Sequence, residues 1–168
     1  GDWGRTAVDG FVRAKLRKAN LRPQKEADRY TLIRRVTFDL TGLPPAPEEI
    51  ADFLKDTSAG AYEKVVDRLL ASPRYGERQA TFWLDLVRYA DSDGFRADAF
   101  RPEAWRYRDY VIAFFNEDKP FDQFVREQIA GDLMTAKNDK TRDAQIVATA
   151  FLTQGPIQEQ NMFKEQLR

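Results

Sequence analysis

Prolines and glycines divide the chain into short segments, and each segment repeats its apolar residues with the period of an α-helix. Pro47, Pro73, Pro102 and Pro120 stand where such segments begin, a position at which proline suits the first turn of a helix. No stretch of alternating β-branched residues is long enough to indicate a sheet. We therefore expect an all-α fold. Its short, proline-punctuated helices favour an irregular orthogonal array over a long parallel bundle.

The periodicity predicts a single domain of about seven to nine helices. Gly42 and Gly131 are expected to end helices, and Ser72 is expected to cap the helix that follows it. We expect the helical domain to span residues 1–157, and residues 158–168 to be a truncated segment. The helix from Pro73 to about Ala90 is predicted to be the buried centre of the core. Apolar residues cover most of its circumference: Phe82, Trp83, Leu84, Leu86, Val87 and Tyr89.

The composition restricts the classes of function. The chain of 168 residues carries 27 basic and 27 acidic side chains, so its formal net charge is zero. No global positive field would attract nucleic acid, and no run of about 18 apolar residues could span a membrane. Neither a nucleic-acid partner nor a membrane span is expected.

The chain contains no cysteine and no histidine. Disulfides, thiol nucleophiles, Ser-His-Asp triads and zinc sites built from His or Cys are therefore excluded within it. Covalent attachment of haem c is excluded too, because the motif Cys-x-x-Cys-His needs both residue types. No cofactor is expected in this chain itself.

A run of carboxylates follows the long fifth segment. Asp91, Asp93 and Asp98 lie close to Gly94, and carboxylates two residues apart before a glycine resemble the start of a calcium loop. These three aspartates are the candidate metal ligands. The alternative is that aspartate and glycine end the helix and form a hydrogen-bonded turn.

Charged residues on two mostly apolar segments form a second candidate site. One interpretation is a network of ion pairs that locks the two helices together. Another is ligand binding by Asp91, Asp93, Arg88 and Arg106. A third is general acid–base catalysis by carboxylates, as in glycoside hydrolysis. The candidate catalytic residues are Asp85, Asp91 and Asp109, and the wider cluster includes Arg88, Arg106 and Arg108.

Aromatic residues lie around these charges, and a run of basic residues lies near the N-terminus. Aromatic side chains can stack on sugars, but helical spacing favours a place in the core. The aromatic set is Trp83, Tyr89, Phe95, Trp105, Tyr107 and Tyr110. The basic residues are spread around one helix and are expected to face solvent. They are Arg13, Lys15, Arg17, Lys18 and Arg22.

Several blocks of the sequence, in their order along the chain, resemble a known family, the domain of unknown function 1549 found in planctomycete bacteria. The resemblance extends from about Val8 to Thr153. The blocks are FDLTGLPP at 38–45, LLASPRYGER at 69–78, WLDLVRYADS at 83–92, WRYRDYVI at 105–112, DKPFD at 118–122 and EQIAGDL at 127–133.

The resemblance implies which domains accompany this one and where the protein is located, and it does not imply a reaction. Members of this family are large exported proteins that often carry a cytochrome c-like domain before this region, and many have a Cys-x-x-Cys-His motif downstream. It thus implies an extracytoplasmic location, haem c in flanking regions, and neighbouring domains as partners. We expect a non-catalytic helical scaffold or docking module of such a protein. The alternative is part of an extracytoplasmic polysaccharide-acting enzyme that uses paired carboxylates.

Overall fold

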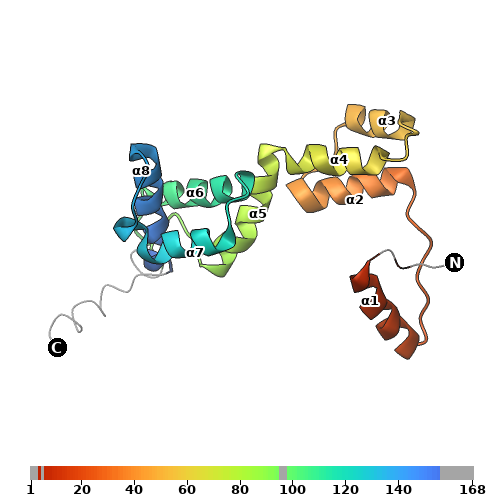
Figure 1. Ribbon diagram of the computed structural model, residues 1–168, viewed down its shortest axis with the longest axis horizontal. Coiled ribbons are helices and arrows are strands. Elements are labelled where there is room, and N and C mark those ends of the chain that lie inside the picture. Colours follow the sequence, from red (N-terminus) through yellow and green to blue (C-terminus); the bar gives the residue numbers. More distant parts are fainter. Residues whose placement is uncertain (1–3, 5, 95–97, 156–168) are drawn as a thin grey trace.

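The structure, a computed structural model, describes residues 4, 6–94 and 98–155. These residues contain no β-strand and only one isolated antiparallel bridge, between Ser92 and Phe100. Helix α8 crosses α6 and α7 steeply (Figure 1), so the predicted all-α fold with non-parallel helices is confirmed. None of the described helices is both long enough and apolar enough to cross a membrane. The elements are α1 (Ala7–Lys18), α2 (Arg29–Thr41), α3 (Pro47–Lys55), α4 (Ala61–Leu70), α5 (Pro73–Leu86), α6 (Ala104–Asn116), α7 (Phe121–Ala130), η1 (Gly131–Leu133), α8 (Asp139–Ala148) and η2 (Thr149–Thr153), where η marks a 3₁₀ helix.

Several helix ends coincide with the residues that the sequence marks. Gly42 ends α2 with a φ of 72°, in the left-handed region that glycine adopts without strain. Pro47 is the first residue of α3. The Ser72 side chain caps α5, and Pro73 follows as its first residue. Gly131 ends α7 as predicted, and the chain continues directly into η1.

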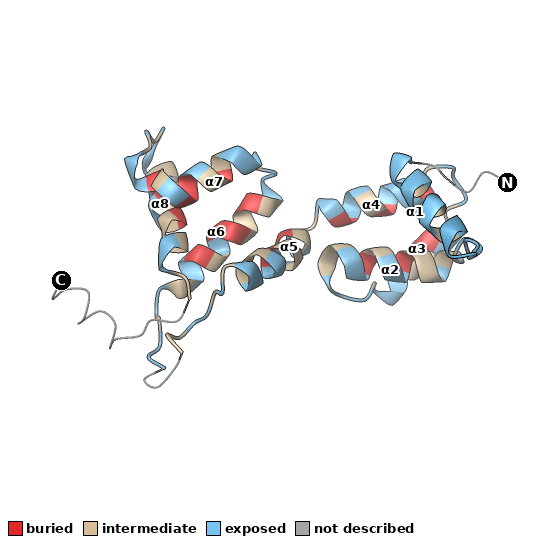
Figure 2. Cartoon of the chain, turned by 90° about the horizontal axis from the view of Figure 1, so that it is seen from below, coloured by how far each residue is buried: buried red, intermediate tan, exposed pale blue. Residues whose placement is uncertain are grey.

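The buried side chains form two hydrophobic clusters, which Figure 2 shows in red on two separate groups of helices. In the larger cluster, the fully buried Phe124 ring stacks on Phe114 with centroids 3.8 Å apart. The Trp83 ring meets Phe124 edge-on at 5.0 Å. The larger cluster consists of Ala80, Tyr107, Tyr110, Val111, Phe114, Phe124 and Ala148. The smaller cluster, on α2 to α4, consists of Ile33, Phe53, Ala61, Val65 and Leu69.

Helix α5 connects the two clusters, and the prediction that it is the buried centre of the core is wrong. Its buried residues are Gly76 and Ala80, whereas Phe82 is 55% and Leu86 is 72% exposed. The helix packs against α2 and α6, so neighbours cover only part of its apolar circumference. The centre of the larger cluster is α6, which buries Tyr107, Tyr110, Val111 and Phe114.

Two polar contacts fix α5 against α6. The backbone N–H of Gly76 donates to Asn116 Oδ1 at 2.8 Å, and a Cβ at position 76 would lie 2.5 Å from that side chain. Farther along, Trp83 Nε1 donates to the Tyr107 hydroxyl at 3.0 Å. The two helices therefore approach closely because residue 76 has no side chain.

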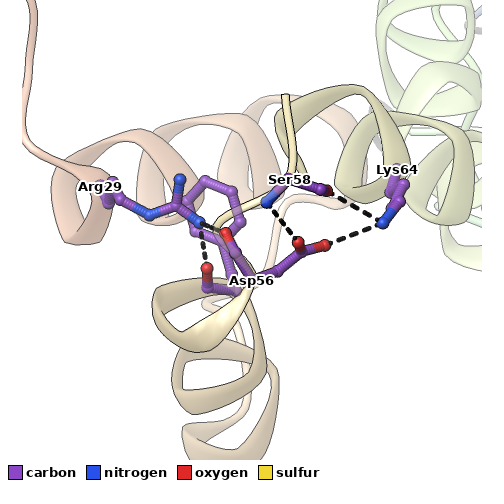
Figure 3. Close-up of polar contacts among 5 residues, drawn as sticks. Arg29, Asp56, Ser58 and Lys64 are labelled. Carbon is purple, nitrogen blue, oxygen red and sulfur yellow. Dashed lines mark hydrogen bonds and ion pairs between the residues drawn. The ribbon is translucent and has the colours of Figure 1, made fainter. Parts of the chain in front are cut away.

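The turn between α3 and α4 is built by charged side chains that cap helix ends (Figure 3). The Arg29 guanidinium donates to the carbonyls of Phe53 and Asp56, the latter at 2.7 Å, and lies over the Phe53 ring at 4.0 Å. The Lys64 ammonium donates to Asp56 and to Ser58, both at 3.1 Å. Hydrogen bonds with Ser58, together with Lys64, lower the pKa of Asp56 to about 2. This cluster is engaged in holding the turn.

Helix α1 lies apart from the other helices (Figure 1). Its N-terminus has a capping box, in which the Thr6 backbone N–H donates to Asp9 Oδ2 at 2.8 Å and the Asp9 N–H donates back to the Thr6 hydroxyl. None of its residues is buried. Phe11 is 77% exposed and Val8 is 67% exposed. Val8, Phe11, Val12 and Leu16 are spaced as an apolar stripe along α1, but the described core does not cover it.

Candidate functional site

The loop that carries the predicted site residues begins earlier than expected. Helix α5 ends at Leu86, not near Ala90, because Arg88 adopts the left-handed conformation with a φ of 59°. The backbone N–H of Tyr89 then donates back to the Leu84 carbonyl at 2.9 Å, which closes the helix end. The Tyr89 hydroxyl donates to Asp91 Oδ1 at 2.6 Å. Asp91 is therefore held at the base of the loop.

Residues 91–94 and 98–101 pair with each other as the two arms of a hairpin. The Asp93 N–H donates to the Ala99 carbonyl at 2.9 Å, and the Arg101 N–H donates to the Asp91 carbonyl at 2.8 Å. The Asp98 carboxylate accepts a hydrogen bond from the Gly94 N–H at 3.1 Å. Residues 95–97, and with them Phe95 of the predicted aromatic set, lie outside the described part of the chain.

The three candidate metal ligands have separate partners. Asp93 forms an ion pair with Arg101, whose NH2 group also donates to the Gly155 carbonyl at 2.7 Å. Asp91 is bound by the tyrosine hydroxyl, and Asp98 by a backbone amide. Within the described residues, no three acidic side chains lie close enough together to hold a metal ion. Metal binding by these aspartates stays a prediction.

The wider charged cluster pairs locally, and among the described residues no ion pair joins α5 to α6. Arg106 pairs with Glu103 at the start of α6. Asp109 pairs with its neighbour Arg108 at 2.9 Å. These four side chains are each at least 42% exposed, so solvent screens the pairs. Asp85 and Arg88 are exposed as well.

A cavity of about 520 Å³ lies between this hairpin, the start of α6 and the segment from α8 to η2. It brings together Asp93 and Arg106, two of the predicted ligand-binding residues. The candidate catalytic residues Asp85, Asp91 and Asp109 do not line it. Tyr107 and the small side chains of α8 and η2 give it an apolar wall.

Polar groups of the cavity can recognise a ligand, and most of them already have partners. Asp93 and Glu103 are neutralised by Arg101 and Arg106, so proton transfer by either carboxylate would require a broken ion pair. The Oε1 atom of Gln154 is buried and accepts no hydrogen bond among the described residues. The polar lining of the cavity therefore consists mainly of two acid–arginine pairs beside an apolar wall.

The most buried polar network involves residues that the sequence interpretation did not select. The Glu127 carboxylate accepts from the Tyr110 hydroxyl at 2.7 Å, from Lys119 Nζ at 2.7 Å and from Gln123 Nε2 at 2.8 Å. Burial by itself would raise the pKa of Glu127, but these donors together outweigh burial and lower it. Next to it, the Tyr107 hydroxyl donates to Gln128 at 2.6 Å.

This network holds α7 against α6. The Glu127 side chain is only 2% exposed, which puts it out of reach of a ligand. Burial, together with the hydrogen bond and charge of Glu127, raises the pKa of Tyr110, and burial raises the pKa of Tyr107 to about 12. Both tyrosines therefore stay protonated and donate. One signal in the sequence could have indicated a buried polar residue on α7. Gln128 follows Phe121 and Phe124 at helical spacing, on the same stripe.

The aromatic set divides between core and surface. Tyr107 and Tyr110 are buried, and Trp83 and Tyr89 pack against the larger cluster while partly exposed. Trp105 is 43% exposed, and Arg106 lies over its ring at 5.0 Å. The expected place in the core is thus correct for most of the described members and wrong for Trp105.

Comparison with known proteins gives the family. Residues 7–168 match the family PSCyt2, described as Protein of unknown function (DUF1549). The match covers nearly the whole chain and includes residues 158–168, so the chain belongs to this family. No curated protein and no solved structure matches the chain.

Proposed function

We propose that this member of the DUF1549 family is a non-catalytic helical module that docks a neighbouring domain of a larger exported protein. The observation that carries the proposal is the exposed apolar stripe of α1. A shallow cavity of about 550 Å³ on this helix is lined entirely by its own side chains and the residues that follow it. These are Phe11, Val12, Lys15, Leu16, Ala19 and Leu21.

Helix α1 is too short to be stable by itself in water, which supports a partner packed on its apolar stripe. An isolated helix of 12 residues is marginal in water, and α1 buries no residue against the rest of the chain. Covering one phenylalanine or leucine side chain stabilises by roughly 1.5–3 kcal/mol, so a partner on the stripe would order the helix. Lys15 lines the same cavity, and its charge favours an acidic group on that partner.

The family resemblance supplies the identity proposed for the partner. Members often carry a cytochrome c-like domain before this region, and α1 is the element nearest to such a domain in sequence. Haem in this proposal belongs to the flanking domain, because the chain itself has no histidine and no cysteine. The extracytoplasmic location is part of the same proposal.

Hydrogen exchange in the full parent protein tests the proposal. The amides of residues 7–18 should exchange much more slowly than those of a free helix, because docking suppresses local opening. Replacing Phe11 and Leu16 together by serine should remove the protection. The matched control replaces Arg17 and Lys18 together by serine on the same helix, and it should leave the protection in place. Fast exchange of α1 in the unaltered parent would refute the proposed docking.

A further inference from the structure

Helices α2 and α5 meet near the middle of the molecule (Figure 1). A third concave surface, separate from the hairpin cavity and from the cavity on α1, is lined by residues of these two helices and by Tyr62 of α4. Its volume is about 600 Å³. Three arginines line it, Arg34 and Arg35 from α2 and Arg78 from α5. One acid, Asp39, lines it as well, so the lining carries a formal net charge of +2.

Two of the guanidinium groups are held in place by aromatic rings. Arg34 lies over the Phe38 ring at 5.0 Å, and Arg78 lies over the Phe82 ring at 4.6 Å. The Arg78 side chain also passes close to Gly42, where an added Cβ would lie 3.1 Å from Arg78 Cδ. Cation–π contacts and close packing restrict the two side chains before any ligand arrives, which favours binding.

The positive charges in this cavity are not matched by acids. Within the described residues, none of Arg34, Arg35 and Arg78 forms an ion pair, and Arg78 Nε is buried without a hydrogen-bond acceptor. Other arginines of the described chain do pair with carboxylates, among them those at positions 68, 74, 101, 106, 108 and 126. Three guanidinium groups without an ion pair thus line one concave surface, and such groups are suited to binding an anion.

We propose that this arginine cavity binds a tetrahedral oxyanion, phosphate or sulfate, either free or as an ester on a larger molecule. The fork of a guanidinium group matches two oxygens of such an anion. The net charge of the lining fits a dianion better than a single carboxylate. The cavity is much larger than an inorganic ion, which leaves room for the organic part of an ester. The proposal is independent of the docking function of α1.

Isothermal titration calorimetry at low ionic strength tests it, with inorganic phosphate, inorganic sulfate and phenyl phosphate as the probes. Arg78→Met and Arg34→Met should each weaken binding by about tenfold or more, the usual effect of losing one charge-assisted contact. Asp39→Asn should tighten binding several-fold, because it removes the opposing charge. Arg126→Met, on the exposed face of α7, is the matched control and should bind normally.

The two sources of the anion are distinguished by the probes. Phenyl phosphate binding about tenfold more tightly than inorganic phosphate would identify an ester, and equal affinities would identify the free ion. The proposal is wrong if none of the three probes binds, or if Arg126→Met weakens binding as much as Arg78→Met does. Arg34 is exposed, so the Arg34→Met variant keeps the test decisive should Arg78→Met unfold.

Discussion

Replacing Lys119 with methionine should destabilise the protein by about 3 kcal/mol, because it leaves the Glu127 carboxylate buried without its counter-charge. The Glu127 side chain is 2% exposed and the Lys119 side chain 16% exposed. Removing one partner of a buried ion pair costs roughly 3–5 kcal/mol. The lower end applies because Tyr110 and Gln123 still donate hydrogen bonds to the carboxylate, and because methionine retains most of the packing of the lysine stem.

Urea denaturation measures this loss directly, and thermal unfolding should show a Tm lower by about 6–12 °C for a domain of this size. The matched control is Arg126→Met, which breaks an ion pair between side chains that are 68% and 63% exposed on the same helix. It should cost less than about 0.5 kcal/mol. The double variant Lys119→Met with Glu127→Gln should be more stable than Lys119→Met alone. A loss below about 1 kcal/mol for Lys119→Met would refute the buried charge pair.

The same carboxylate predicts a dependence of stability on pH. The pKa of Glu127 is lowered in the folded state from its ordinary value of 4.5. Below pH 4.5, Glu127 binds a proton in the unfolded chain but stays ionised in the folded chain. The free energy of unfolding therefore falls as the pH decreases toward the folded pKa. Glu127→Gln should make the loss of stability between about pH 5 and pH 3 smaller. A loss of the same size in the variant and the unaltered protein would contradict an ionised Glu127.

Three further predictions test packing and the hairpin. Gly131→Ala should destabilise the protein by about 1–3 kcal/mol, because its Cβ would lie 2.2 Å from a backbone oxygen of α8. Gly10→Ala has open space around the new methyl group, and it should stabilise α1 when measured by the same urea denaturation. Trp83→Ala should cost about 3 kcal/mol, near the lower end for a large aromatic side chain because the ring is partly exposed. Phe82→Ala should cost less than about 1 kcal/mol, and equal losses at the two positions would contradict the described packing. Millimolar calcium should leave the Tm unchanged, because Asp93 is already paired with an arginine; a calcium-dependent rise that Asp93→Asn abolishes would restore the metal-binding interpretation.

Local signals in the sequence predicted the helices well. Gly42, Ser72 and Pro73 mark helix boundaries through their own backbone preferences, which need no distant partner. The end of α5 was placed too late, because the left-handed turn at Arg88 is formed by a residue with no strong preference for it. Short-range signals therefore predict where the helices lie. They mispredict a helix end where the end does not depend on the preference of the local residue.

The site was harder to predict because charge pairing depends on neighbours in space. Asp93, a candidate ligand-binding residue, lines the hairpin cavity, but its partner Arg101 is eight residues away in the sequence. Arg106 and Asp109 were grouped in one predicted charged cluster, but Arg106 pairs with Glu103 instead. The buried Glu127 was overlooked because an acid in a helix is usually exposed. Its burial requires the charge and hydrogen bonds that Lys119, Tyr110 and Gln123 supply from their positions in space.

Helices α1 and α5 show why an apolar face does not by itself define a core. Both have apolar stripes at helical spacing, yet α1 buries no residue and α5 buries only Gly76 and Ala80. The periodicity of apolar residues shows which face of a helix is hydrophobic. Whether that face is buried depends on which other helices pack against it. On α5 the opposite surfaces belong to α2 and α6, and they cover one part of the helix. On α1 nothing in the described chain does so, and since a short helix gains most of its stability from packing, the ordering of α1 in the parent protein is the quantity that reports whether a partner is present.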